Sequence, residues 1–177
     1  MKYSYQNLIN LNPAAKTFLD LGCGQGFVSL YACARGLQVD AVDIEKVTPL
    51  AIQDLKTVNY ISADLNSWQP ADKYDIIVAH HSLQFLSKKY ALNEFIPKLC
   101  ASLNQGGLLE IFSFTPEEEL NVPTKYTLEE ILAALNFDLE VIKQEVLSYE
   151  GLHKKLGKHT FHELHVIARK KVYFKKI

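Results

Sequence analysis

Arginine is scarce in this chain of 177 residues: only Arg35 and Arg169 occur among its 19 basic residues. Planar, bidentate recognition of phosphate or guanine relies on arginine, so this scarcity disfavours a nucleic-acid-binding protein. The net charge of −1 points the same way, because no basic field covers the chain. We therefore expect no nucleic acid among the partners.

Cysteine is scarce as well, with Cys23, Cys33 and Cys100 scattered and without a CxxC pair. Isolated cysteines in odd number fit a reducing compartment better than a disulfide scaffold. No apolar run reaches the length of a membrane span, and the first residues lack the apolar core of a signal peptide. We therefore predict a soluble, cytoplasmic protein without a membrane partner.

What the chain does have is a globular composition, with 48% hydrophobic and 22% charged residues. Its length is that of one ordinary domain, and no repeat or linker divides it. The composition leaves the oligomeric state open.

Short apolar segments alternate with helical patterns along the chain, which predicts a mostly parallel sheet with helices on both faces. Two further strands are expected to close the sheet, joined by a long hairpin connection over residues 148–160. We expect the strands at residues 17–21, 37–43, 58–63, 74–79, 108–114, 138–147 and 161–169.

Helix signals lie between these strands. Thr48–Pro49 is typical of a helix start, and Thr127–Glu130 is a capping box that opens a helix to about residue 136. Residues 88–104 predict a helix that Pro97 kinks or divides. The first 16 residues read as turn-like. Over 27–35 the spacing predicts a helix ended by Gly36, with one face formed by Phe27, Leu30, Tyr31 and Ala34.

The most informative stretch is the glycine loop Gly22–Gly26, which follows the first strand. Glycine permits tight turns and lets a ligand approach the main chain. The dinucleotide fingerprint GxGxxG would require glycine at position 27, where this chain has Phe27. The loop therefore favours a nucleoside-like ligand other than a nicotinamide dinucleotide.

Asp43 and Asp64 end or follow the next two strands. An acid after the second strand can accept hydrogen bonds from a ribose diol, and one after the third strand can accept from an adenine amine. Each acid alone also fits a turn or a solvated loop. Together with the glycine loop, they predict a nucleoside-like cofactor at one rim of the sheet.

These residues resemble a known family. Asp20-Leu-Gly-Cys-Gly-Gln-Gly26, Asp43 and Asp64 are similar to the cofactor-binding motifs of class I S-adenosylmethionine-dependent methyltransferases. Within that class the likeness is closest to the tellurite-resistance methyltransferases. The likeness extends over Ser29–Tyr31, Asp64–Asn66, Tyr74–Ala79, Gln84–Leu86, Gly106–Leu109 and Ala168–Lys171.

The resemblance implies a three-layer Rossmann-like α/β sandwich, with a seven-stranded, mostly parallel sheet whose last strand is antiparallel. We expect residues 1–177 to form a single domain. Its expected parts are an N-terminal segment (1–16), a cofactor-binding core (17–115), and a C-terminal helix and β-hairpin (116–177).

The resemblance also implies that S-adenosylmethionine is the cofactor and S-adenosylhomocysteine the product. The glycine loop would contact the methionine part, Asp43 the ribose, and Asp64 with Leu65 the adenine. Asp20 would order the loop. The full predicted set is Asp20, Gly22, Cys23, Gly24, Gly26, Asp43, Ile44, Asp64, Leu65, Ala79 and His80.

Methyl transfer from a sulfonium needs alignment of the reactants and no protein nucleophile. A general base is needed only for a protonated acceptor. The predicted bases are His80 and His81, which follow the fourth strand, and His153. His153–Lys154 matches a His-Arg pair of the family, with lysine in place of arginine. Tyr3 and Tyr5 are aromatic residues that could fold over the cleft.

We predict no metal site, because His162 and His165 would face opposite sides of a strand. The Ala79-His80-His81-Ser82 stretch lacks the Asn/Asp-Pro-Pro-Tyr/Phe motif of DNA amine methyltransferases, which favours a small-molecule acceptor. Two alternatives stay open: a non-catalytic S-adenosylmethionine-binding regulatory protein, and a nucleotide-dependent oxidoreductase.

Overall fold

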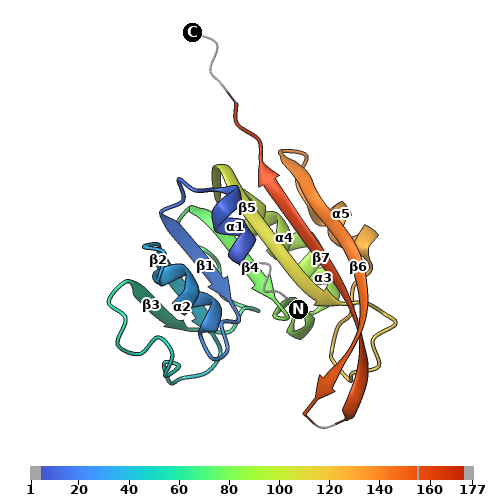
Figure 1. Ribbon diagram of the computed structural model, residues 1–177. Coiled ribbons are helices and arrows are strands. Elements are labelled where there is room, and N and C mark those ends of the chain that lie inside the picture. Colours follow the sequence, from blue (N-terminus) through green and yellow to red (C-terminus); the bar gives the residue numbers. More distant parts are fainter. Residues whose placement is uncertain (1–4, 155, 174–177) are drawn as a thin grey trace.

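The computed structural model describes residues 5–154 and 156–173, which form one seven-stranded sheet in the order β3-β2-β1-β4-β5-β7-β6 (Figure 1). Strands β1 to β5 run parallel, and β7 runs antiparallel to both β5 and β6. The predicted fold class is thereby confirmed. The strands are β1 (Thr17–Leu21), β2 (Gln38–Asp43), β3 (Val58–Ser62), β4 (Tyr74–His80), β5 (Leu103–Phe114), β6 (Leu139–His153) and β7 (Gly157–Lys170).

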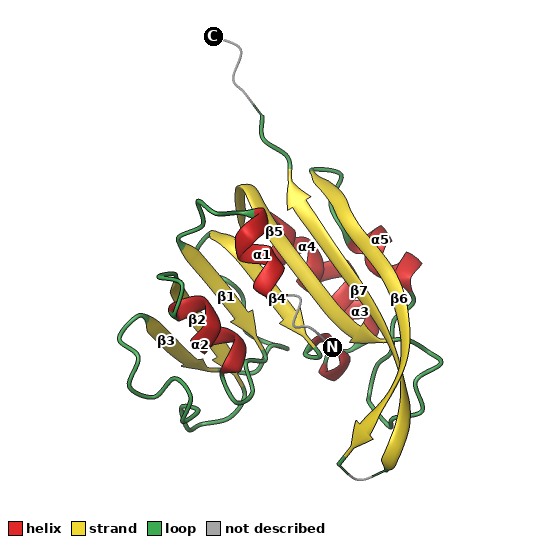
Figure 2. Ribbon diagram, in the orientation of Figure 1, coloured by secondary structure: helices red, strands yellow, loops and turns green. Residues whose placement is uncertain are grey.

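Helices lie on both faces of the sheet, as the alternation predicted (Figure 2). One face carries α1 (Tyr5–Leu11) and α2 (Phe27–Cys33), which pack on an apolar core that includes Leu8 and Ala32. The opposite face carries α3 (Lys88–Tyr90), α4 (Ile96–Ala101) and α5 (Leu128–Ala134) over a second core. The capping box is confirmed, because Thr127 accepts from the Glu130 N–H and Glu130 accepts from the Thr127 N–H.

The division predicted at Pro97 is also confirmed. After the 3₁₀ turn η1 (Leu83–Phe85) and α3, the chain forms a single π turn, η2 (Ala91–Phe95), before α4 begins. Proline lacks an N–H for the helical ladder, so a change of hydrogen-bond pattern beside Pro97 avoids an unmade bond. The helix ends at Ala101 rather than Asn104, because β5 already begins at Leu103.

Two predictions near the N-terminal half were wrong. Residues 5–11 form a helix rather than turns, because Leu8 becomes fully buried between that helix and the sheet. No helix begins at Thr48–Pro49; residues 50–54 form turns instead. The cause is Ile52, which is drawn into the core beneath the glycine loop and bends the chain back, with its N–H donating to the Pro49 carbonyl.

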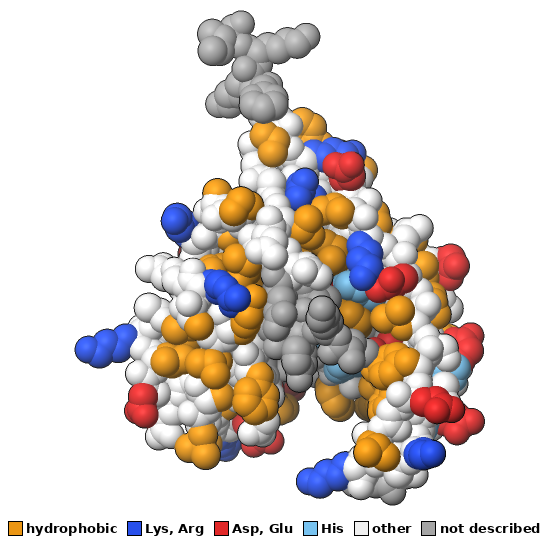
Figure 3. Space-filling model, in the orientation of Figure 1, with side chains coloured by type: hydrophobic (Ala, Val, Ile, Leu, Met, Phe, Trp, Pro, Cys, Tyr) orange, Lys and Arg blue, Asp and Glu red, His pale blue; other side chains and the backbone are white. Residues whose placement is uncertain are grey.

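The helix expected after the glycine loop is present, but its buried side is not the face formed by Phe27, Leu30, Tyr31 and Ala34. Phe27 is 66% exposed, whereas Ser29 and Ala32 are buried against the sheet. Small side chains let this short helix approach closely, and the Ser29 hydroxyl donates to Asp20 at 2.6 Å. Figure 3 shows hydrophobic side chains gathered at the lower left of the molecule, where Figure 1 places α2.

Both strands extend into the connection that was expected over residues 148–160, β6 as far as His153 and β7 from Gly157. Ser148–His153 pairs residue by residue with Gly157–His162, so β6 and β7 run on as a ribbon beyond the end of β5. The alternating exposure of β6 explains the error, because a ribbon with two accessible faces has few apolar residues to mark it as strand.

Candidate functional site

A cavity of about 440 Å³ opens at the carboxyl ends of β1, β2, β3 and β4. In open α/β sheets this edge is the usual ligand crevice. The residues that line the cavity come from the glycine loop, from the segments after β2 and β3, and from the segment after β4. They are Gly22, Gly24, Asp43, Ile44, Ala63, Asp64, Leu65, Asn66, His81, Ser82, Phe85 and Leu86.

The glycine loop is held against β2 by its own backbone. The N–H groups of Gly22 and Cys23 both donate to the Val42 carbonyl, at 2.8 and 3.0 Å. Gly22 has φ +69°, and a Cβ atom there would lie 2.6 Å from the Ser82 Cβ. Only glycine fits a position that combines a left-handed conformation with such close packing. The loop therefore presents bare backbone to the cavity.

Asp43 and Asp64 both reach this cavity, as predicted from their strand-end positions. Asp43 Oδ2 accepts from the Gly24 N–H at 2.8 Å, which ties the second strand to the loop. Asp64 Oδ1 accepts from the backbone and side-chain nitrogens of Asn66, both at 2.9 Å. These two hydrogen bonds lower the pKa of Asp64, so it is ionised at neutral pH.

Asp20 lies beneath the loop rather than on the cavity surface. It is 2% exposed, and burial raises the pKa of its carboxyl despite the hydrogen bond from Ser29. This position agrees with a role in ordering the loop. Cys23 is also buried, and burial raises the pKa of its thiol to about 12, so it remains protonated.

His81 has the most unusual backbone at the site. It has φ 52°, the only positive φ of a non-glycine residue in the described part of the chain. Such conformations are uncommon outside glycine and cluster at functional sites. Its N–H donates to the Phe112 carbonyl at 3.0 Å, and its ring is tilted against that of Phe114 with centroids 4.7 Å apart.

The surroundings of His81 keep it uncharged. Burial, with a smaller contribution from His80, lowers the pKa of His81 to about 4, and Glu118 opposes this shift. Its Nε2 lies 3.4 Å from Glu163 Oε1. At neutral pH the imidazole is therefore neutral, with one nitrogen that can donate a hydrogen bond and one that can accept one.

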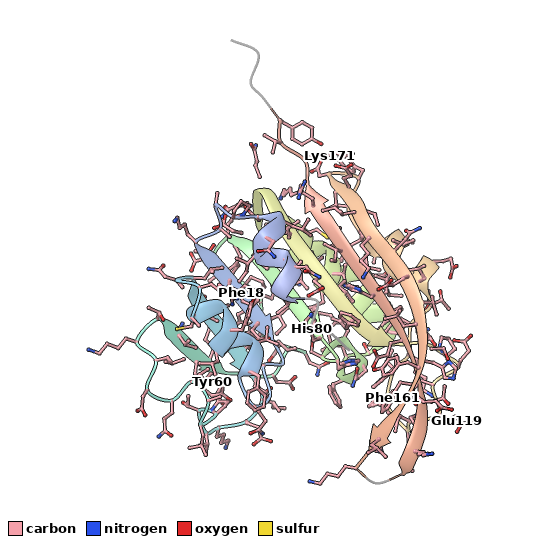
Figure 4. All side chains as sticks on the ribbon, viewed as in Figure 1. Phe18, Tyr60, His80, Glu119, Phe161 and Lys171 are labelled. Carbon is pink, nitrogen blue, oxygen red and sulfur yellow. The ribbon has the colours of Figure 1, made fainter. Side chains whose placement is uncertain are left out.

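His80 points away from the cavity into a buried chain of carboxylates and imidazoles. Its Nε2 lies 2.7 Å from Glu110 Oε2, and the other Glu110 oxygen lies 2.8 Å from His165 Nε2. His165 Nδ1 then meets Glu145 at 3.0 Å. This chain crosses β4, β5, β7 and β6. Figure 4 shows His80 at the end of β4 near the middle of the molecule.

His153 is not brought to the cavity. It ends β6 on the ribbon, where its ring lies 6.1 Å from that of His159 and 6.3 Å from that of Phe161. Figure 4 shows Phe161 on this ribbon, well apart from His80. His159 in turn pairs with Glu118, Nε2 to Oε1, at 2.6 Å.

The structure therefore divides the residues predicted as a site. It gathers Gly22, Gly24, Asp43, Ile44, Asp64, Leu65 and His81 around one cavity. Six others do not line it: Asp20, Cys23, Gly26, Ala79, His80 and His153. Tyr3 and the side chain of Tyr5 lie outside the described residues.

Sequence reasoning missed the acids inside strands. Glu110 and Glu163 are 0% and 2% exposed; Glu110 follows Leu108 and Leu109 in a largely apolar stretch of β5, whereas Glu163 lies between His162 and Leu164 on β7. A charged residue in the middle of a buried strand is itself a signal, since burying a carboxylate without a partner is costly. The single charged residue within the apolar segment 108–114 was the signal that could have identified Glu110.

No helix among the described residues has both the length and the apolar character that crossing a bilayer requires. Among the same residues, no cluster of three or more His, Cys, Asp or Glu side chains is arranged to hold a metal ion.

Structural comparison finds the same fold in solved methyltransferases. TehB of Haemophilus influenzae has a TM-score of 0.77 at 22% identity, over 95% of this chain and 62% of that one. The 1,6-didemethyltoxoflavin-N1-methyltransferase of Burkholderia thailandensis, with S-adenosylhomocysteine bound, has a TM-score of 0.69 at 19% identity, over 96% and 77%. At this identity the likeness shows the fold.

Sequence comparison finds related methyltransferases. The trans-aconitate 2-methyltransferase of Azoarcus sp. (strain BH72) is 34% identical over 100 residues, which are 55% of this chain and 38% of that protein. Malonyl-[acyl-carrier protein] O-methyltransferase 2 of Ilyobacter polytropus is 28% identical over 78% of this chain and 52% of its own. The chain thus spans about half the length, or less, of these relatives.

A family model described as tellurite resistance protein TehB matches residues 7–155. That match spans most of the chain, including the glycine loop, both strand-end acids and the segment after β4. The chain therefore belongs to the tellurite resistance protein TehB family, as the resemblance of its motifs predicted.

Proposed function

We propose that this protein binds S-adenosylmethionine in the cavity and transfers the methyl group to a small molecule. The observation that carries the proposal is the meeting of the glycine loop, Asp43 and Asp64 on one cavity. The relatives support it, since their names describe methyl transfer to trans-aconitate and to malonyl-[acyl-carrier protein], and a structural neighbour carries S-adenosylhomocysteine.

Within the proposal, each part of the cavity has a partner on the cofactor. The bare backbone of Gly22 and Gly24 would face the methionine part, Asp43 the ribose hydroxyls, and Asp64 with Leu65 the adenine. Asp43 already accepts from Gly24 and, at 3.3 Å, from Glu45. A carboxylate has about four acceptor positions, so it can still accept from a diol.

S-Adenosylmethionine supplies an activated methyl group, because the sulfonium is a good leaving group. The chain's own part is to hold the acceptor in line and to exclude water. No protein nucleophile is required, and the protonated thiol of Cys23 agrees with that. We also propose that the protein acts in the cytoplasm, where its three free cysteines would stay reduced.

Calorimetric titration tests the proposal. S-Adenosylmethionine and S-adenosylhomocysteine should bind, and NADH should not. The matched variants are Asp43→Ala in the cavity and Asp54→Ala, which removes an exposed acid that does not line it. Failure of the folded wild-type protein to bind either sulfur compound would overturn the proposal.

A further inference from the structure

The side of the cavity that follows β4 is formed by one short turn. We call Ser82–Leu86 the wall turn; it contains η1, and three of its residues, Ser82, Phe85 and Leu86, line the cavity. The N–H groups of Phe85 and Leu86 donate within the turn in the pattern of a 3₁₀ helix. A single 3₁₀ turn is marginal on its own, so its position depends on its contacts with the rest of the chain.

Thr124 contacts the backbone of the wall turn twice. It lies on the loop of residues 115–127 that connects β5 to α5, which we call the clamp loop (Figure 1). The Thr124 N–H donates to the Gln84 carbonyl at 3.0 Å, and its Oγ1 donates to the Leu86 carbonyl at 2.7 Å. Because Leu86 lines the cavity, this hydroxyl is bound directly to the backbone of the cavity wall.

Tyr126 adds a third contact from the clamp loop. Its side chain is fully buried, and its hydroxyl donates to the Leu83 carbonyl at 2.8 Å. Burial raises the pKa of this phenol, so it stays protonated and acts as the donor. The Tyr126 N–H donates to the Phe114 carbonyl at 3.0 Å, which ties this end of the clamp loop to the end of β5.

Glu118 attaches the other end of the clamp loop to the ribbon of β6 and β7. Its carboxylate is 1% exposed. Oε1 accepts from the Leu120 N–H at 2.8 Å and lies 2.6 Å from His159 Nε2, while Oε2 accepts from the His162 N–H at 2.8 Å. The backbone carbonyl of Glu118 also accepts from Lys125 Nζ. One buried side chain thus joins the loop to itself and to β7.

These contacts keep Glu118 charged. Burial raises the pKa of the carboxyl, but the hydrogen bonds from the His162 and Leu120 N–H groups and from His159 outweigh this effect and lower the pKa. The group is therefore ionised at neutral pH. Hydrogen bonds to a charged acceptor are about twice as strong as neutral ones, so the clamp loop is firmly attached at this point.

Resting on the proposed binding of S-adenosylmethionine, we propose that Glu118, Thr124 and Tyr126 are positioning residues for the cofactor. None of the three lines the cavity. They act through the wall turn: Glu118 fixes the clamp loop, and the other two fix the carbonyls that place Phe85 and Leu86 at the cavity. A wall that is already in place costs the ligand no ordering when it binds, which raises the affinity.

Calorimetric titration with S-adenosylmethionine tests the Thr124 hydroxyl. Thr124→Val keeps the shape of the side chain but removes the donor to Leu86, and it should raise the Kd about fivefold. Thr124→Ser keeps the donor and should bind like the wild-type protein. Thr160→Val makes the same chemical change at an exposed position of β7 and is the control. Equal Kd values for Thr124→Val and Thr124→Ser would overturn the role of this hydroxyl.

Glu118 is tested beside its neighbour on the same loop. Glu118→Gln cannot accept hydrogen bonds at both positions and should raise the Kd about fivefold. Glu119→Gln, which changes an exposed side chain, should leave the Kd unchanged. Because Glu118 acts through the loop that carries Thr124, the double variant Glu118→Gln/Thr124→Val should weaken binding by less than the product of the single effects. Fully multiplying losses would contradict action through one loop.

Urea unfolding of the same variants separates positioning from support of the fold. Variants that lose stability but keep the wild-type Kd while folded would show that these residues only stabilise the structure, and the proposal would be wrong. Tyr126→Phe keeps the buried ring and removes only the donor to Leu83, so it provides the measurement if Glu118→Gln does not fold; we expect a Kd about fivefold higher. Failure of the folded wild-type protein to bind S-adenosylmethionine would instead count against the proposed function itself.

Discussion

The strands β3, β2, β1 and β4 contribute to the cavity through the segments that follow them, whereas β5 and β7 contribute no lining residue and instead carry buried charged side chains within the strands. On the cavity side, Gly24 and Asp64 are exposed at the edge of the sheet. On the second side, Glu110, Glu163 and His165 are 0%, 2% and 1% exposed. The cavity side is built of backbone and solvated acids, and the side formed by β5 and β7 holds buried charge.

The two sides differ in what their polar groups cost the stability of the fold. Loop glycines and edge acids cost the fold little, because water still solvates the acids. Buried carboxylates and imidazoles are costly, and an apolar core of the same shape would often be as stable. The buried carboxylates and imidazoles between β4 and β6 are therefore groups that this chain keeps at a cost to its stability.

The largest effect is expected at Glu110, because a substitution there disrupts the buried network of β5 and β7 directly. Glu110→Gln leaves His80 and His165 without their shared carboxylate and should lower the free energy of unfolding by about 4 kcal/mol. Urea denaturation measures it, with exposed Glu140→Gln as the control. A loss below about 1 kcal/mol would mean that the network does not stabilise the fold.

Gly22 and Gly24 test how closely the glycine loop on the cavity side is packed. An alanine Cβ at Gly22 would lie 2.6 Å from the Ser82 Cβ, whereas at Gly24 nothing lies within 4 Å. Both positions have positive φ, so both variants carry strain of about 1 kcal/mol. Overpacking should make Gly22→Ala about 2 kcal/mol less stable than Gly24→Ala by thermal or urea unfolding. Equal stabilities would contradict the close packing of Gly22 on Ser82.

Asp43 tests the exposed acids by binding rather than by stability. Asp43→Ala should weaken S-adenosylmethionine binding by about 1–2 kcal/mol, roughly tenfold in Kd, because a charge-assisted hydrogen bond is lost. Calorimetry checks this against Asp54→Ala. An unchanged Kd in a folded variant would remove Asp43 from the proposed ribose site.

The smallest effect concerns pH and His81. Its folded pKa of about 4 lies below the ordinary 6.5, so the unfolded state takes up the proton first as the pH falls. The stability that this residue contributes is complete above pH 6.5 and is lost as the pH falls through 4. Since the side chain is 36% exposed, we expect about 1 kcal/mol.

Unfolding curves at pH 7 and pH 4 measure this effect in the wild-type protein and in His81→Asn. The variant should lose less stability between the two pH values, because it lacks the titrating group. Identical losses would show that His81 is solvated well enough to titrate normally.

On the cavity side the sequence signals are local. A glycine loop after a short apolar strand, and single acids such as Asp43 and Asp64 at strand ends, can be recognised without knowing any long-range contact. The strand order and the antiparallel β7 came from the family resemblance. The capping box at Thr127 and the break at Pro97 rest on backbone hydrogen bonding, which neighbouring residues determine.

The contacts of the buried charged groups on β5 and β7 could not be predicted, because these groups meet only after the sheet forms. Glu110 and His165 are 55 residues apart in the sequence and join through the β5–β7 register. His81 and Glu163 depend on the same pairing. The α2 face was missed for a similar reason: close packing against the sheet favoured Ser29 and Ala32 over the larger Phe27 and Leu30.

The chain His80–Glu110–His165–Glu145 has a consequence for folding. It links four strands, and each contact requires its residues to face the same side of the sheet. A shift of β7 by one residue would turn His165 to the opposite face and leave Glu110 buried without it. A mispaired sheet would therefore lose one of the two imidazole partners of a buried carboxylate, so the network favours the native register of β7.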